Sequence, residues 1–84
     1  MLKVIYFGAN WCAPCKMFSP IVESVVGKVG VQYQKVDIDY SPELTQQYGI
    51  SSVPTVIFEK NGQVVGKTGT TTPISLEKLI QKYQ

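Results

Sequence analysis

The apolar and polar positions along the chain form patterns typical of both strands and helices. Leu2 to Phe7 is a nearly continuous apolar run rich in β-branched and aromatic residues, which predicts an internal strand covered on both faces. Between Cys12 and Lys28 the apolar residues recur three and four positions apart, which predicts one face of a helix. Pro14 fits the first turn of this helix, and Pro20 inside it predicts a kink.

Three further strands are predicted along the chain. Val31 to Asp39 is the second strand, Thr55 to Phe58 the third and Gln63 to Thr68 the fourth. Between the last two lies Asn61-Gly62, the strongest short-range signal for a tight hairpin turn. The third and fourth strands are therefore expected to pair antiparallel.

Two more helices are predicted from their capping residues. Ser41-Pro42 begins a short helix that ends at Gly49, and either Thr72-Pro73 or Ser75 begins the last one. The element order is then βαβαββα in a single domain of residues 1–84, and the right-handed crossover makes the first two strands parallel. The expected fold class is α/β, a four-stranded mixed sheet with helices on both faces.

Composition and charge exclude several classes of function. The net charge is +2, the eight lysines are scattered and arginine is absent, so neither nucleic acid nor a membrane surface is an expected partner. The sequence has no apolar run long enough for a membrane span and no signal-peptide pattern at its start, so a cytoplasmic setting is expected. The absence of histidine excludes Cys–His and Ser–His pairs and histidine-ligated metal sites.

The only two cysteines, Cys12 and Cys15, are the candidate reactive groups. A structural zinc site takes four Cys or His ligands, which this chain does not supply, so no metal is expected. A disulfide across so short a loop would contribute only roughly 2 kcal/mol in the chain-entropy model, and it would join no distant elements. Two cysteines at i and i+3 on a helix can instead open and close a disulfide without unfolding anything, so we favour redox chemistry.

The two thiols are expected to have different roles. Cys12 lies at or just before the start of a helix, where free N–H groups and the helix dipole favour an anion. Its pKa should therefore be lower than that of a free thiol, which makes it the attacking group. Cys15, one turn further along, should be less exposed and should resolve the mixed disulfide.

The residues around this pair resemble the thioredoxin family. Trp11 to Lys16 matches that family's Trp-Cys-Gly-Pro-Cys-Lys with alanine for glycine, and Tyr48 to Thr55 resembles its Tyr-Gly-Ile…Pro-Thr segment. Lys35 to Asp39 and Phe58 to Gly62 match a family strand and hairpin. The resemblance covers nearly the whole chain and implies a thioredoxin-like fold of about glutaredoxin length, without the family's usual first strand and helix.

The resemblance also implies roles for individual residues. Pro54 would follow a cis peptide bond and face the dithiol, and Val53 would offer backbone groups to an extended substrate segment. Trp11 would flank the active site, and Pro14 would lie between the two cysteines. An apolar contact patch around the attacking cysteine would be formed by Ile38, Val53 and Gly69.

Two positions depart from the family pattern. Gly8 stands where many relatives have an aromatic residue, which should loosen the loop or reshape the contact surface. Tyr6 stands where the family has a buried aspartate, usually assigned as the proton acceptor for the resolving cysteine; a phenol is a poor base at neutral pH. Lys35, at the position that pairs with that aspartate, is left without a carboxylate and should either lower the Cys15 pKa or be solvated. The proton route from Cys15 stays open between water, Lys35 and Tyr6.

The sequence thus predicts a thiol–disulfide oxidoreductase that reduces protein disulfides, needs no cofactor, acts as a monomer and is recycled by a thioredoxin reductase. Two alternatives stay open. One is a glutaredoxin-like enzyme using glutathione, which the length favours but which lacks a convincing glutathione-binding segment near Gly69 to Thr71. The other is a binding subunit whose redox chemistry is not used.

Overall fold

Seven helices and strands follow one another in the order βαβαββα, which confirms the sequence prediction. The structure, a computed structural model, describes residues 1–84. Its strands are β1 (Leu2–Gly8), β2 (Gln32–Asp37), β3 (Thr55–Lys60) and β4 (Gln63–Thr68). Its helices are α1 (Ala13–Val29), α2 (Pro42–Gln47) and α3 (Pro73–Tyr83).

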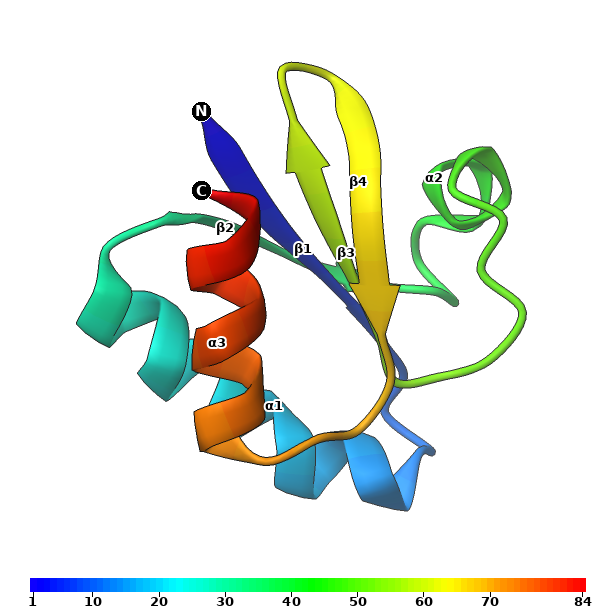
Figure 1. The fold of residues 1–84 in the computed structure, drawn as a ribbon. Helices are drawn as coiled ribbons and strands as arrows, with labels where there is room; N and C mark the ends of the chain where they lie inside the picture. Colours follow the sequence, from blue (N-terminus) through cyan, green and yellow to red (C-terminus); the bar gives the residue numbers. More distant parts are fainter.

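The four strands form one mixed sheet in the spatial order β2-β1-β3-β4 (Figure 1). β1 pairs parallel with β2 and antiparallel with β3, and the hairpin joins β3 to β4 antiparallel. β1 is therefore an internal strand, which explains why its sequence is apolar on both faces.

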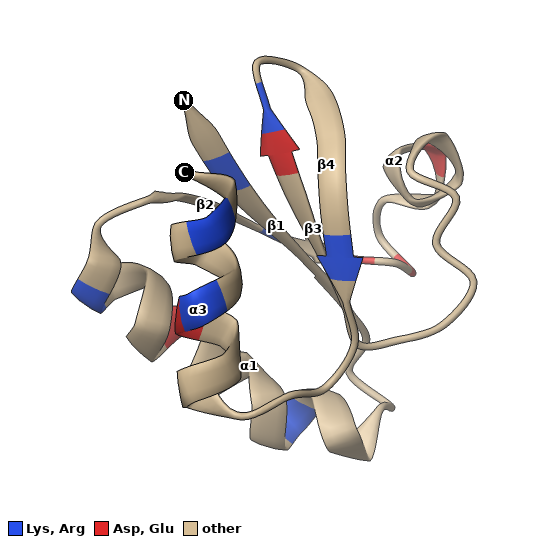
Figure 2. Ribbon diagram, viewed as in Figure 1, with Lys and Arg blue, Asp and Glu red and all other residues tan.

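Helices cover both faces of this sheet, as expected for the α/β class. α1 and α3 pack on the face that carries Leu2, Val4 and Tyr6, and the segment around α2 packs on the opposite face. Figure 1 shows α1 and α3 together, with α2 set apart on the other side of β4. Charged residues are distributed over most of these elements without a large cluster of one sign (Figure 2). None of the helices combines the length and the apolar character needed to cross a membrane.

The helix ends follow from local residues. Cys12 is the N-cap of α1, and Gly30 closes the helix in the left-handed conformation with φ of 81°. The helix continues through Pro20 rather than ending there. Thr72 is the N-cap of α3, because its side chain accepts a hydrogen bond from the Ser75 N–H at 3.1 Å.

Tyr48, directly after α2, ties this helix to the sheet. Its ring packs against Phe7 with ring centroids 5.6 Å apart, and its hydroxyl donates a hydrogen bond to Glu59 on β3. This hydrogen bond, and then burial, raises the pKa of Tyr48 to about 12. The folded protein therefore holds this proton more tightly than the unfolded chain.

We expect the contribution of Tyr48 to the stability of the oxidised protein to be lost as the pH rises from about 10 to about 12. Below the unfolded pKa both states are protonated, and the contribution is fully present. As the pH rises through this window the unfolded phenol ionises first, and the contribution is lost. Partial exposure limits the effect to under about 1 kcal/mol. Urea unfolding of Tyr48→Phe should show a flatter alkaline slope than the parent, with Tyr40→Phe as the exposed control; equal slopes would contradict the assignment.

Candidate active site

Cys12 and Cys15 form a disulfide at the start of α1, with Cα atoms 5.2 Å apart. Cys12 is the residue before the first turn and Cys15 lies within that turn, as the spacing predicted. Their side chains are 5% and 3% exposed, so burial hardly distinguishes them in the oxidised state. Their positions relative to the helix end are what differ.

The end of α1 favours a negative charge on Cys12. The Cys15 backbone N–H donates to Cys12 Sγ at 3.2 Å, which makes the sulfur the capping acceptor of the helix. The first turn contains no acidic residue that would oppose this effect. An N–H aimed at Cys12 Sγ and the positive end of the helix dipole both stabilise a thiolate there.

The loop before β3 lies directly opposite Cys12. The Val53–Pro54 peptide bond is cis, as the resemblance implied, and Pro54 is buried. The Val53 carbonyl oxygen lies 3.8 Å from Cys12 Sγ. Gly69 lies beside this loop, since a Cβ atom placed on it would be 3.8 Å from the Pro54 oxygen. The structure thus places the Val53 carbonyl at Cys12 Sγ and Gly69 beside the same loop.

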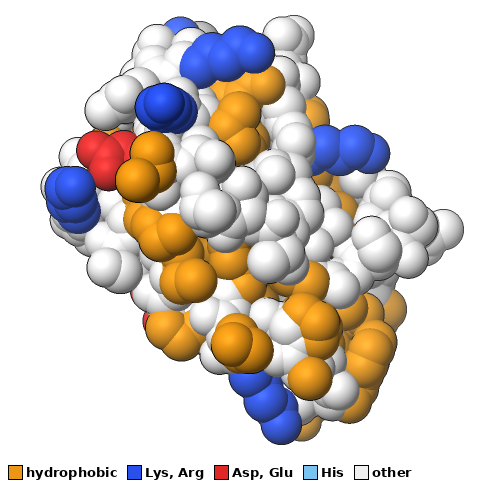
Figure 3. Space-filling view, turned by 60° about the horizontal axis from the view of Figure 1, so that its bottom comes forward, with side chains coloured by type: hydrophobic (Ala, Val, Ile, Leu, Met, Phe, Trp, Pro, Cys, Tyr) orange, Lys and Arg blue, Asp and Glu red, His pale blue; other side chains and the backbone are white.

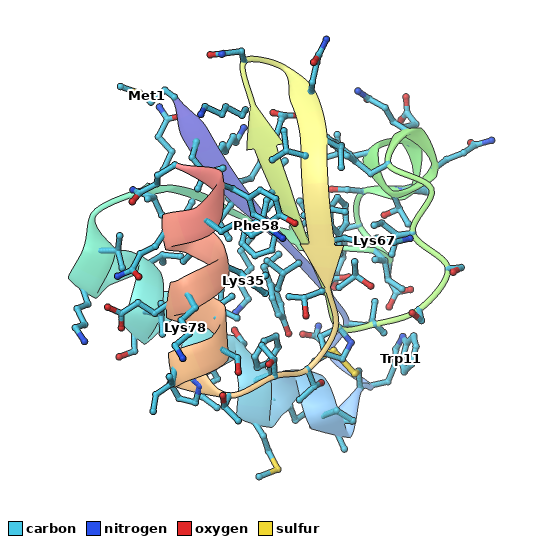
Figure 4. All side chains as sticks on the ribbon, viewed as in Figure 1. Met1, Trp11, Lys35, Phe58, Lys67 and Lys78 are labelled. Carbon is cyan, nitrogen blue, oxygen red and sulfur yellow. A yellow bond between two sulfur atoms is a disulfide. The ribbon has the colours of Figure 1, made fainter.

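Trp11 lies at the edge of the dithiol and is 66% exposed. Its indole Nε1 donates to Asp39 Oδ2 at 2.9 Å, so the ring is held by the segment after β2. Figure 3, which brings this end of the molecule forward, shows exposed apolar side chains gathered there. In Figure 4 the labelled Trp11 projects outward next to the yellow sulfur atoms. Asp39 was not among the site residues predicted from the sequence, although it lies in the matched Lys35 to Asp39 segment.

The other expected contact residues lie in the same region. Ile38 and Val53 are half-buried and pack against the core cluster that contains Cys12. Pro14 occupies the first turn of α1 between the two cysteines, where its missing N–H costs nothing.

Tyr6 lies beneath the dithiol on β1 and is 1% exposed. Its hydroxyl donates to the backbone oxygen of Cys15 at 3.2 Å, not to a sulfur atom. Burial, and then the negative charge of Glu23, raises the pKa of Tyr6. A phenol held protonated in this way is a hydrogen-bond donor, which argues against Tyr6 as the proton acceptor for Cys15.

Gly8 provides the space that the Tyr6 ring occupies. The two residues point to the same face of β1, and a Cβ atom on Gly8 would lie 2.7 Å from Tyr6 Cε2 and 2.8 Å from its hydroxyl oxygen. The expectation that Gly8 loosens a loop is wrong, because Gly8 is a buried residue at the end of β1. Tyr6 and Gly8 are therefore sterically linked.

Lys35 is not left without a carboxylate, so that expectation is also wrong. Its Nζ pairs with Glu23 Oε2 at 3.3 Å, and the Ser19 hydroxyl donates to the same oxygen at 3.3 Å. The carboxylate comes from α1 and not from β1. Ser19 and Glu23 were not predicted as site residues from the sequence, although they follow Cys15 at a spacing of four.

A cavity of about 340 Å³ opens beside Cys15. Its walls include Cys15, Ser19, Tyr6 and Lys35, so it joins Cys15 to the polar side chains of α1 and β2. The chain has no group of three or more His, Cys, Asp or Glu residues that could hold a metal ion. This arrangement can therefore perform thiol chemistry next to polar side chains.

Comparisons with known proteins agree with this geometry. The family model described as Thioredoxin matches residues 1–82. The thioredoxin of Chlamydia trachomatis is 45% identical over 85 residues, covering 99% of this chain and 83% of its own length. Among solved structures, Fasciola hepatica thioredoxin superposes with a TM-score of 0.91 at 31% identity, covering 99% of this chain and 81% of that one. A mutant thioredoxin from Halobacterium salinarum gives a TM-score of 0.91 at 30% identity, covering 98% and 74%.

Proposed function

The chain belongs to the thioredoxin family and is a thiol–disulfide oxidoreductase, and from this premise we propose that it reduces protein disulfides through Cys12 and Cys15. The observation that carries the proposal is the contact between the Cys15 N–H and Cys12 Sγ at the start of α1. It favours Cys12 as the thiolate that attacks and leaves Cys15 within bonding distance to resolve the product.

The reaction proceeds in two exchanges. Cys12 thiolate attacks one sulfur of the substrate disulfide, the substrate S–S bond breaks, and one substrate sulfur leaves as a thiolate. Cys15 thiolate then attacks Cys12 Sγ, the mixed disulfide breaks, and the second substrate sulfur leaves. Two electrons have passed to the substrate, and the protein ends with its Cys12–Cys15 disulfide.

The surroundings of Cys12 favour a polypeptide as substrate. The Val53 carbonyl lies beside Cys12 Sγ, where an extended chain could pair with the backbone of this loop. Trp11 offers an exposed aromatic surface next to the same sulfur. We assign Val53, Pro54, Gly69 and Trp11 to substrate contact, and Pro14 to fixing the backbone between the cysteines.

The proposal extends to the setting of the reaction. A thioredoxin reductase would return the electrons, and the protein would act as a monomer in the cytoplasm without a bound cofactor. The thioredoxin relatives support a reductase as partner, since they match this chain over nearly all of its length.

Insulin reduction tests the proposal directly. We expect the protein to reduce insulin disulfides with NADPH and thioredoxin reductase, and to do so much less with NADPH, glutathione reductase and glutathione. Turnover only in the glutathione arm would contradict the proposal and identify a glutaredoxin-like enzyme. A Cys12→Ser/Cys15→Ser double variant that kept full biological activity would instead identify a binding subunit.

A further inference from the structure

We propose that Cys15 is deprotonated through Ser19, which passes the proton on to Glu23. The inference rests on the proposed function, because it concerns the exchange in which Cys15 resolves the mixed disulfide. The step needs a proton acceptor, since the thiolate and not the thiol attacks a disulfide. Tyr6 does not fill this role, because its hydroxyl donates to the Cys15 backbone oxygen.

The three residues lie along one face of α1. Cys15, Ser19 and Glu23 are spaced four apart, and residues at this spacing are neighbours on a helix surface. The Ser19 hydroxyl donates to Glu23 Oε2 at 3.3 Å, and Cys15 and Ser19 line the same cavity. A hydroxyl is both donor and acceptor, so Ser19 can accept a proton from one neighbour while it gives its own to the other.

Burial decreases along this face in the direction that the proton would travel. Cys15 is 3% exposed and Ser19 is 8% exposed, whereas the Glu23 side chain is 46% exposed. A proton that starts on the buried sulfur would therefore end on a carboxylate in contact with solvent. From Glu23 it can leave to water, which prepares the protein for the next cycle.

The charged and titratable groups around Glu23 are compatible with its role as the proton acceptor. From β2, Lys35 Nζ pairs with Glu23 at 3.3 Å, and its side chain is labelled in Figure 4. Also from β2, the Tyr33 hydroxyl is buried without a hydrogen-bond partner, and burial and then the charge of Glu23 raise the pKa of Tyr33. From β1, Tyr6 is held protonated by burial and by the same charge, which raises its pKa. Both phenols therefore stay protonated and are not competing bases.

Two further charged residues line the cavity beside Cys15, namely Lys16 and Asp37. Lys16 is a donor and accepts no proton in its charged form. Asp37 Oδ1 already accepts the Asp39 backbone N–H at 2.8 Å. Of the carboxylates near this cavity, Glu23 is the one bonded to a hydroxyl one helical turn from Cys15.

The step balances as follows. The Cys15 Sγ–H bond breaks and its proton passes to Ser19 Oγ, while the Ser19 hydroxyl proton passes to Glu23 Oε2. The electron pair left on Cys15 Sγ forms the bond to Cys12 Sγ. The bond between Cys12 and the substrate sulfur breaks, and the substrate leaves as a thiolate. Glu23 touches neither sulfur; it positions Ser19 and receives the proton from its hydroxyl.

Stopped-flow release of an aromatic thiol separates this step from the first exchange. Mixing the reduced protein with dithiobis(nitrobenzoic acid) should release one equivalent of thiol on attack by Cys12 and a second on resolution by Cys15. At neutral pH, Glu23→Gln should slow the second release by roughly tenfold to a hundredfold and leave the first within about twofold. At about pH 10, where a thiol ionises without a base, the rates of the second release in the variant and the parent should converge.

Two further variants make the test specific. Ser19→Ala should slow the second release as Glu23→Gln does, and the double variant should be no slower than either alone. Glu77→Gln is the matched control, because it also breaks a lysine pair, with Lys28 at 3.1 Å, but lies on α3 away from the cysteines. It should change neither release.

Several results would overturn the inference. One is a second release that is equally fast in the parent and in Glu23→Gln at every pH. Another is a variant in which both releases are slowed by the same factor. The third is a second release in Ser19→Ala that is as fast as in the parent. These failures are distinct from failure of the proposed function. If the parent itself released no thiol, or only the first equivalent, the dithiol mechanism would be wrong whatever the variants did.

Discussion

Cys12→Ser is expected to abolish insulin reduction, by about a thousandfold or more, because it removes the attacking sulfur altogether. A serine hydroxyl at the same place would receive the same N–H from residue 15, but it does not ionise at neutral pH and forms no bond with a disulfide sulfur. The reduced variant should also lose rapid alkylation by iodoacetamide. In the parent, the pH dependence of alkylation should give Cys12 a pKa below the usual thiol value of about 8.5.

Cys15→Ser is the matched variant, because it removes the other sulfur of the same turn. It should also stop turnover, but by a different route: Cys12 still attacks, and the mixed disulfide then accumulates because nothing resolves it. Mass spectrometry of a reaction with a disulfide peptide should find the peptide bound to Cys15→Ser and not to Cys12→Ser. Adduct formation on Cys12→Ser alone would reverse the assigned roles.

The second large effect concerns the packing of Tyr6 against Gly8 beneath the dithiol. Gly8→Ala should cost about 1–3 kcal/mol in free energy of unfolding, because the added methyl group would lie 2.7 Å from the buried Tyr6 ring. The backbone at Gly8 does not require a positive φ. The cost should therefore come from overpacking and not from backbone strain.

A double-mutant cycle separates these causes. Tyr6→Leu removes the ring tip and should itself be destabilising, since it empties space in the core and ends the bond to the Cys15 oxygen. In that background Gly8→Ala should be neutral or slightly stabilising, which gives a coupling energy of about 1–3 kcal/mol by urea unfolding. Tyr6→Phe is the control for the hydroxyl and should leave most of the coupling intact. Additive costs for the two sites would show that the ring and Gly8 are independent.

The steric link between Tyr6 and Gly8 explains how these two residues fit together beneath the dithiol. A tyrosine at position 6 needs more space than a smaller side chain, and the glycine two residues along the strand supplies it on the same face. The ring also packs near Phe18 of α1, with ring centroids 6.4 Å apart. The uncharged side chain of Tyr6 thus fills the region beneath the dithiol, and the carboxylate near this region, that of Glu23, belongs to α1.

Local patterns in the sequence were sufficient for the elements, because helix and strand formation depend on nearby residues. The pattern of apolar positions and the capping residues together predicted all three helices and all four strands in order. Thr72 was one of the two residues predicted to begin the last helix, and it is the N-cap. Boundaries were less accurate: β2 ends at Asp37, two residues earlier than predicted, and β3 continues to Lys60. Such ends depend on pairing with neighbouring strands.

The sequence by itself also determined the chemistry, because Cys12 and Cys15 are three positions apart at the start of one helix, where side chains at this spacing meet. Only the tertiary structure decided what surrounds them. The ion pair of Lys35 with Glu23 and the fit of Tyr6 over Gly8 depend on how α1 packs against the sheet and on which face each strand residue takes. Spacing along a chain specifies neighbours within an element, whereas contacts between elements follow from packing geometry that no local pattern records.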